Sequence, residues 1–207
     1  HEVLFGKKRV LVTGAGTGVG RGVALRFARA GADVALHYSH SGEGADAAAG
    51  QARAWGVRAE AMQADFADVN AVTALAGRAA AFLHGVDVLV NNAGITMNMP
   101  FEEVTQEQYD TLFAVNMRAM FFLTQALARG MREAGGGCII NVCSVHAFAG
   151  LREHSVYAAT KGAINSFTRQ LAIELAPHGI RVNAIAAGPI EVENHARCVP
   201  NRTVNGS

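Results

Sequence analysis

Short apolar runs rich in β-branched residues alternate along the chain with longer, alanine-rich segments. Nearly continuous hydrophobicity over a short run is typical of a parallel strand covered on both faces. The runs predict six strands, at residues 9–13, 33–38, 57–64, 86–90, 138–142 and 181–186. The segments between them predict helices at residues 18–31, 43–55, 70–83, 105–131 and 155–176. Repeated strand–helix–strand units imply right-handed crossovers, so we expect an α/β fold with a doubly wound parallel sheet and helices on both faces.

Local signals support two of these helices. Thr105 followed by Gln108 matches a capping box, which starts the fourth helix. Pro177 and Gly179 close the fifth helix. The sequence contains no repeat, low-complexity tract or linker, so we expect one domain over residues 1–207.

Composition narrows the classes of function. Of the 207 residues, 50% are hydrophobic and 17% charged, with a net charge of +1. The chain has no basic patch for nucleic acid and no run of 18 apolar residues, so we expect neither a nucleic-acid partner nor a membrane span. Cys138, Cys143 and Cys198 show no metal-ligand spacing, so we expect no metal site; they fit reduced thiols in a cytoplasmic protein.

A glycine-rich segment, T-G-A-G-T-G-V-G at residues 13–20, follows the first predicted strand and precedes a helix. The common G-x-G-x-x-G spacing does not fit, because Val19 stands where the third glycine would fall. Glycines at this place let backbone N–H groups approach a pyrophosphate at the helix's positive end. A plain tight turn is the alternative. The cofactor contacts predicted here are at Gly14, Thr17, Gly18, Val19 and Gly20.

Several further motifs occur in order: Asn91-Asn92-Ala93-Gly94, Asn116, Ser144 and Tyr157-x-x-x-Lys161. With the glycine loop, they make the chain resemble the short-chain dehydrogenase/reductase family over residues 4–190. Within that family it is most similar to 3-oxoacyl-[acyl carrier protein] reductases and to sugar or polyol dehydrogenases. The resemblance implies a Rossmann-like, NAD(P)-dependent oxidoreductase.

Tyr157 and Lys161 are four residues apart, so a helix places them on one face. A free tyrosine has a pKa of about 10 and is a poor base near neutral pH. A neighbouring ammonium, together with an oxidised nicotinamide, favours the phenolate. The tyrosine then exchanges a proton with the substrate oxygen. A packed tyrosine with a solvated lysine one turn later is the structural alternative.

The resemblance assigns roles to three more residues. Ser144, which follows a predicted strand, would bond the substrate oxygen, and Asn116 would hold a water that relays protons to Lys161. His146 and His154 flank the site, and we place His146 with Ser144 and Tyr157 among the substrate contacts. The alternatives are a turn serine, a satisfied buried amide and solvated histidines.

The choice of cofactor depends on the end of the second predicted strand. NAD-binding proteins place an acid there to bond the ribose 2′-OH. Here the residues are His37-Tyr38-Ser39-His40, while Asp33 lies too early in the strand. Ser39 and His40 could donate to a 2′-phosphate, so we expect NADP(H), with NAD(H) as the alternative. Thr17 occupies the position where many NADP-binding members carry a basic residue, and an ordinary solvated loop also fits Ser39 and His40.

Other cofactor contacts follow from the resemblance alone. Asp65 would bond the adenine with help from the backbone of Phe66, unless Asp65 is a helix N-cap. The adenosine ribose would lie near Asn92, Ala93 and Gly94, a run that could also be a structural turn. The backbone around Gly188 and Ile190 would meet the nicotinamide amide, where Val192 cannot supply the family's threonine hydroxyl.

The expected function is hydride transfer between a carbonyl and a secondary alcohol, with a 3-oxoacyl compound as one substrate class and a sugar or polyol as another. A non-catalytic nucleotide sensor or scaffold on the same fold is the rival. Family members commonly pair through the fourth and fifth helices, so a homodimer or homotetramer is expected. We also expect a substrate-covering segment to be missing between about Cys198 and Arg202, and residues 203–207 to be the end of a seventh strand.

Overall fold

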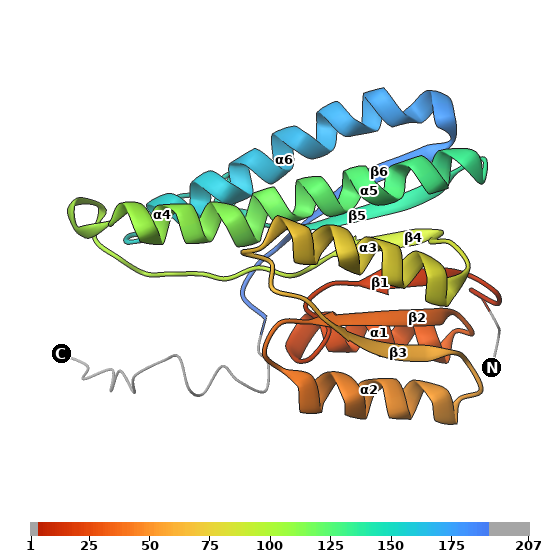
Figure 1. Cartoon of the computed structure of the whole chain (residues 1–207). Helices are drawn as coiled ribbons and strands as arrows, with labels where there is room; N and C mark the ends of the chain where they lie inside the picture. The colour runs from red at the N-terminus through yellow and green to blue at the C-terminus, as the bar shows by residue number, and fades with distance from the viewer. Residues whose placement is uncertain (1–3, 191–207) are drawn as a thin grey trace.

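Six parallel strands form one sheet in the computed structural model, which describes residues 4–190 (Figure 1). The strands are β1 (Arg9–Val12), β2 (Asp33–Tyr38), β3 (Ala59–Gln63), β4 (Val88–Asn91), β5 (Gly137–Ser144) and β6 (Ile180–Ala187). Their order across the sheet is β3-β2-β1-β4-β5-β6. The order reverses between β1 and β4, and such a switch point opens a crevice at the carboxyl ends of the strands.

Helices cover both faces of the sheet, which confirms the doubly wound α/β fold (Figure 1). They are α1 (Gly18–Arg29), α2 (Gly42–Ala54), α3 (Val69–Leu83), α4 (Gln106–Phe113), α5 (Ala119–Glu133) and α6 (Ser155–Leu175). In β1, Val10 and Val12 pack with α1 and α2, whereas Leu11 packs with α3 and α5 on the other face. Three short 3₁₀ turns complete the described chain: η1 (Phe101–Glu103), η3 (Val145–Ala147) and η4 (Ala176–His178).

The helix predicted at residues 105–131 is not uniform. It begins with the predicted capping box of Thr105 and Gln108. Between α4 and α5 the backbone forms a π-helical segment, η2 (Ala114–Arg118). Such π segments occur frequently at functional sites, and this one contains Asn116.

The continuous helix over Gln106–Glu133 has 28 residues and enough apolar character to span a membrane by length and composition, although it has no unbroken run of 18 apolar residues. The core helix of a soluble protein passes the same test. Leu123, Leu127 and Met131 of this helix are buried in the cluster that joins α3 to the sheet. Core packing therefore accounts for part of the apolar composition, since 44% of the most apolar 18-residue stretch is buried.

Buried amides and hydroxyls connect the centre of the sheet to α5 and α6. The Asn91 side chain in β4 donates to Asn141 Oδ1 (2.9 Å) and to Thr124 Oγ1 (3.1 Å). Asn141 in turn donates to Thr168 Oγ1 (2.9 Å). Because buried polar groups are costly unless they are bonded, this chain of contacts fixes the relative positions of β4, β5 and both helices.

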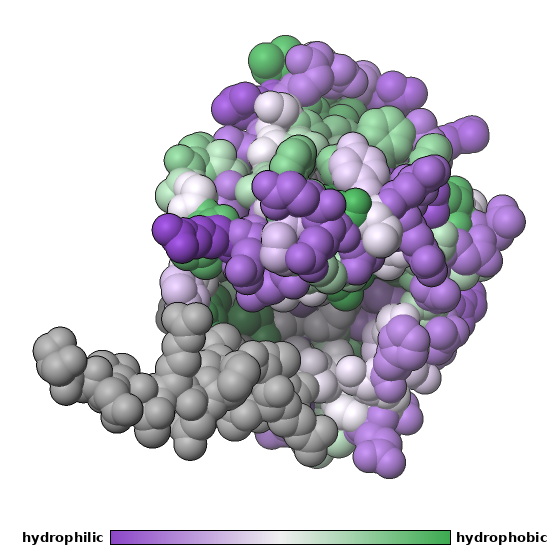
Figure 2. Space-filling model, turned by 90° about the vertical axis from the view of Figure 1, so that its left-hand side faces the viewer, coloured by the Kyte–Doolittle hydropathy of each residue, from purple (hydrophilic) through white to green (hydrophobic). Residues whose placement is uncertain are grey.

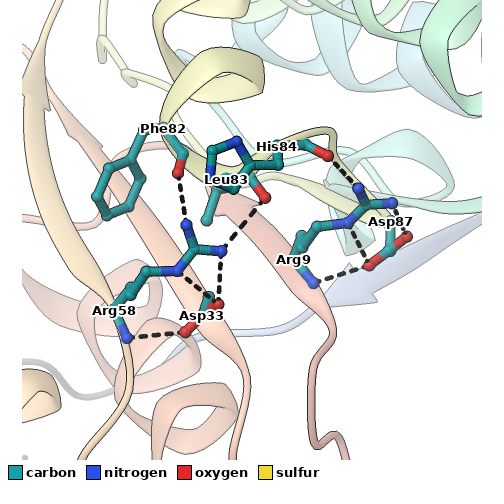
Figure 3. A network of polar contacts seen from close by, with 7 residues as sticks. All are labelled: Arg9, Asp33, Arg58, Phe82, Leu83, His84 and Asp87. Carbon is teal, nitrogen blue, oxygen red and sulfur yellow. Dashed lines mark hydrogen bonds and ion pairs between the residues drawn. The ribbon is translucent and has the colours of Figure 1, made fainter.

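At the amino ends of β2 and β3, the Arg58 side chain bonds the C-terminus of α3 (Figure 3). Its guanidinium donates to the carbonyl oxygens of Phe82 (3.0 Å) and Leu83 (3.4 Å) and pairs with Asp33 (2.9 Å). A cation at this place satisfies helix carbonyls that lack intrahelical partners. Asp33 is thus part of the fold and lies away from the carboxyl ends of the strands, in agreement with its early position in β2.

Arg9 makes a second connection beside the first (Figure 3). Its guanidinium donates twice to the Asp87 carboxylate, at 2.6 and 2.9 Å, and also bonds the carbonyl oxygen of His84. His84 is the left-handed C-cap of α3. The Arg9 guanidinium and backbone hold the pKa of Asp87 below its usual range.

We predict that Asp87→Asn lowers the free energy of unfolding by about 1–2 kcal/mol at pH 7, because the charged hydrogen bonds to Arg9 are lost. A carboxyl with a lowered folded-state pKa stabilises the protein above its unfolded pKa of about 4, and that stabilisation is lost as pH falls further. The difference between wild type and variant should therefore shrink below pH 4. Urea unfolding between pH 3 and 7 measures it.

The matched control is Glu133→Gln, which removes the exposed ion pair with Arg129. This change should alter the free energy of unfolding by less than about 0.5 kcal/mol. Equal effects of the two substitutions at pH 7 would contradict the role assigned to Asp87.

Candidate active site

A cleft of about 780 Å³ lies at the carboxyl ends of the strands. Figure 2 shows this end of the molecule, where the surface is hollowed. The predicted cofactor residues all line the cleft: Gly14, Thr17, Gly18, Val19, Gly20, Ser39, His40, Asp65, Phe66, Asn92, Ala93, Gly94, Tyr157, Lys161, Gly188 and Ile190. The fold therefore brings together residues that are spread over most of the sequence. Val192 and residues 198–207, which carried further expectations, lie outside the described residues.

The glycine loop is pressed against β4 and the start of α1. Gly14 has a φ of +63°, and an added Cβ would lie 2.9 Å from the Cα of Ala93. A Cβ on Gly20 would collide with the carbonyl oxygen of Gly14. The Asn92 side chain donates to the carbonyl oxygens of Thr13 (2.9 Å) and Gly14 (3.2 Å). This packing explains the glycine spacing and holds the loop backbone at the wall of the cleft.

The start of α1 suits an anion. The helix begins at Gly18, its first turn contains no acidic residue, and the N-cap Thr17 makes no side-chain capping bond. Helix N-termini carry partial positive charge and unpaired N–H groups, which bind phosphates. Because Thr17, Gly18 and Val19 line the cleft, these residues fit the pyrophosphate of a dinucleotide.

The turn after β3 forms another wall of the cleft. Asp65 Oδ1 accepts from the backbone N–H of Ala67 (2.9 Å), whereas the N-cap of α3 is Asp68, which accepts from Asn70. The N-cap alternative for Asp65 is therefore wrong. Beside this turn, Ser39 and His40 follow the last residue of β2 and face the same cleft.

His37 also lines this wall, although the sequence reasoning did not select it. Its Nδ1 accepts from the Gly14 N–H (3.2 Å), its Nε2 lies 3.0 Å from the Ala64 carbonyl oxygen, and its ring stacks on Phe66 at 4.0 Å. Burial, with a smaller contribution from the charge of Arg78, lowers the pKa of His37 to about 4. The available signal was a histidine within an otherwise apolar strand.

Tyr157 and Lys161 lie near the start of α6 and face the cleft together. The Lys161 Nζ is 5.5 Å from the centre of the Tyr157 ring and donates to the Val142 carbonyl oxygen at 3.0 Å. Ser144 is the last residue of β5, two residues beyond the predicted end of that strand, because β5 pairs with β6 as far as Ala187. The three polar side chains therefore meet at one end of the cleft.

Burial acts on both ionisable groups. It raises the pKa of Tyr157, although the hydrogen bond with Ser144 opposes this shift. Burial also lowers the pKa of Lys161. The lowering of the Tyr157 pKa expected from Lys161 is therefore wrong for the protein alone, where burial sets the direction of the shift.

Asn116 lies behind the cleft wall and is fully buried. Its Oδ1 accepts from the Ile95 N–H (2.8 Å), and its Nδ2 donates to the Ile95 carbonyl oxygen (2.9 Å) and to Thr160 Oγ1 (3.1 Å). The side chain is therefore a satisfied buried amide, as the structural alternative predicted. It connects the π segment to α6 one residue before Lys161.

The rings of His146 and His154 both lie beside the Tyr157 ring. The centre of the His146 ring is 5.4 Å from that of Tyr157 and 4.9 Å from that of His154. Burial lowers the pKa of His146, and the neighbouring charge of His154 adds to the shift. His146 is not among the cleft-lining residues, and its Nδ1 is buried with no hydrogen-bond partner in the described part of the chain. Ser144 Oγ accepts from the His146 backbone N–H (3.2 Å), so Ser144 also has the turn role proposed as its alternative.

Known proteins have sequences similar to this one. A family model of short chain dehydrogenases matches residues 8–202. Versicolorin reductase 1 of Aspergillus parasiticus is 38% identical over 186 residues, which cover 90% of this chain and 71% of the relative. L-rhamnose 1-dehydrogenase (NAD(P)(+)) of a Sphingomonas species is 38% identical over 187 residues, which cover 90% and 74%.

Solved structures match the fold. A short chain dehydrogenase from Burkholderia cenocepacia in complex with NADP has a TM-score of 0.88 and 39% identity, over 91% of this chain and 77% of that one. A 7α-hydroxysteroid dehydrogenase complexed with NADH and 7-oxo glycochenodeoxycholic acid has a TM-score of 0.91 and 30% identity, over 97% and 78%. The chain therefore belongs to the short-chain dehydrogenase/reductase family of NAD(P)-dependent oxidoreductases.

Proposed function

We propose that the protein interconverts a carbonyl compound and a secondary alcohol with NADP(H), and that residues 1–207 form one dinucleotide-binding and catalytic domain. The observation that carries the proposal is the convergence of Ser144, Tyr157 and Lys161 in the cleft that also contains the glycine loop. When bound, the nicotinamide supplies the hydride.

Tyr157, Ser144 and Lys161 carry out the proton transfer and the stabilisation of charge that accompany the hydride transfer. Tyr157 donates its phenolic proton to the carbonyl oxygen during reduction and takes a proton from the alcohol during oxidation. Ser144 donates a hydrogen bond to the same substrate oxygen and stabilises the charge that develops on it. Lys161, held by the Val142 carbonyl, keeps positive charge near the phenol and favours the phenolate.

Two further residues support this arrangement. The Asn116 side chain bonds Thr160 and so connects the π segment to α6 beside Lys161. This bond helps to keep Lys161 in its place in the cleft. A water held at Asn116 would complete a proton path to Lys161. The His146 ring lies 5.4 Å from that of Tyr157, centre to centre, and this neighbourhood supports a contact of the His146 ring with substrate.

The end of β2 favours NADP(H) over NAD(H). Ser39 and His40 face the cleft, and no carboxylate stands at the end of β2 to repel a 2′-phosphate. Ser41, the N-cap of α2, lines the cleft too, so the positive end of that helix lies on the same side. The solved structures include one complex with NADP and one with NADH, so the choice rests on the residues at the end of β2.

The substrate class has two candidates, a 3-oxoacyl compound and a sugar or polyol. The names of the relatives favour no single one, since one is a versicolorin reductase and another an L-rhamnose dehydrogenase. A panel of ketones, 3-oxoacyl thioesters and sugars, followed by NADPH absorbance, separates the two classes.

Self-association and location complete the proposal. Exposed Phe121 on α5 contacts Phe167 on α6, with ring centres 5.3 Å apart, and an apolar hollow lies beside Phe121. This surface favours a homodimer or homotetramer.

Cys138 and Cys143 are free thiols, which fits the cytoplasm.

Replacing Tyr157 by phenylalanine tests the acid–base role. The variant should lose turnover by about a hundredfold to ten-thousandfold, because general acid–base catalysis contributes roughly 10²–10⁴-fold and no other group replaces the phenol. Its NADPH dissociation constant should stay within a few-fold of wild type. Steady-state rates and NADPH fluorescence titration measure the two effects.

Tyr109→Phe is the matched control, because Tyr109 is exposed on α4, away from the cleft. It should keep wild-type turnover. Retained turnover in Tyr157→Phe would refute the assigned role.

Cofactor choice can be reversed at Ser39. Wild type should bind NADPH more tightly than NADH, and Ser39→Asp should weaken NADPH binding by about tenfold or more through repulsion between the carboxylate and the 2′-phosphate. NADH binding should change little. Fluorescence titration of both nucleotides measures the ratio, and tighter binding of NADH by wild type would contradict the preference.

A further inference from the structure

We infer that His37 is a positioning residue for the dinucleotide: its neutral imidazole sets the distance between the glycine loop and the turn after β3. The inference rests on the proposed function, because it concerns how the same cleft is shaped. It is carried by two hydrogen bonds and a ring contact that connect three separate parts of the chain.

Residue 37 bonds two consecutive amides of the glycine loop. Its side-chain Nδ1 accepts from the Gly14 N–H at 3.2 Å, and its backbone carbonyl accepts from the Ala15 N–H at 2.7 Å. The backbone bond is available to any residue, but the Gly14 bond needs a side-chain acceptor at that place. The histidine side chain therefore adds a constraint on the loop at its left-handed residue, Gly14.

The other side of the ring holds the turn that contains Asp65 and Phe66. Nε2 lies 3.0 Å from the Ala64 carbonyl oxygen, and the ring stacks on Phe66 at an interplanar angle of 9°. Because a carbonyl can only accept, Nε2 must carry the hydrogen, which leaves Nδ1 free to accept from Gly14. The two contacts thus select one tautomer.

The neutral state fits this geometry. His37 is 1% exposed, and burial keeps the imidazole uncharged at neutral pH. A protonated Nδ1 would face the Gly14 N–H, donor against donor. An apolar side chain would fill the same space, but it would leave the Gly14 N–H and the Ala64 carbonyl without this partner. Since both neighbours line or flank the cleft, the cost would fall on the cofactor site.

Two substitutions separate the two bonds. In asparagine, Oδ1 occupies the place of Nδ1, so His37→Asn can keep the bond to Gly14. In glutamine, Nε2 occupies the place of the imidazole Nε2, so His37→Gln can keep the bond to Ala64 and loses the one to Gly14. We expect the NADPH dissociation constant to rise about tenfold in His37→Gln, because a buried N–H left without an acceptor is costly, and to rise less in His37→Asn, which loses only the bond to the Ala64 carbonyl.

NADPH fluorescence titration measures both variants, with thermal unfolding to confirm that each is folded. Wild-type affinity for NADPH in both variants, or weaker binding in His37→Asn than in His37→Gln, would overturn the inference. If wild type bound neither NADPH nor NADH, the proposed function itself would fail. Binding by wild type with unchanged affinity in both variants would overturn only the role of His37.

A measurement on wild type keeps the inference testable if a variant does not fold. Long-range ¹H–¹⁵N NMR spectra of the imidazole at pH 7 should show His37 with hydrogen on Nε2 and a bare Nδ1. Hydrogen on Nδ1 would overturn the assignment, because that nitrogen could then not accept from Gly14.

Discussion

The close approach of β1 and β4 at the point where the strand order reverses determines where this protein can act. Connections leave β1 and β4 in opposite directions, so a crevice opens between them at the carboxyl edge. Asn92 closes the floor of this crevice by bonding the carbonyls of Thr13 and Gly14. A Cβ at Gly14 or Gly20 would push the two segments apart, so the glycines are required by packing before any ligand is considered.

The amino and carboxyl edges of the sheet, where the strands begin and end, differ in how their polar groups are paired. At the amino edge, Arg9 and Arg58 use their donors on helix carbonyls and on the carboxylates of Asp87 and Asp33, so charge there is paired and serves stability. At the carboxyl edge, the helix end at Thr17 lacks such compensation. The fold thus neutralises polar groups at one edge and leaves them available to a ligand at the other.

The sequence predicted the fold because its signals are local and repeated: apolar runs, helix caps and the turn glycines. Strand ends followed by Gly14, Ser39 and Ser144 placed these residues at the carboxyl ends of a parallel sheet, whereas Asp65 was selected through the resemblance to the family; all four line the cleft. The π segment at Asn116 and the role of His37 were not predictable in this way. Both depend on partners distant in sequence, Thr160 for Asn116 and Ala64 with Gly14 for His37, and no period or spacing encodes such contacts.

The pKa directions at the active site also required the structure. Spacing alone suggested that Lys161 makes Tyr157 more acidic, but burial raises the pKa of Tyr157 and lowers that of Lys161. Each shift disfavours the charged form of its group, so in the protein alone both the phenol and the amine favour their neutral states more than they would in water. Burial at the bottom of the cleft is therefore part of the chemistry, because the same exclusion of water that disfavours each charge alone strengthens the attraction between them once both form.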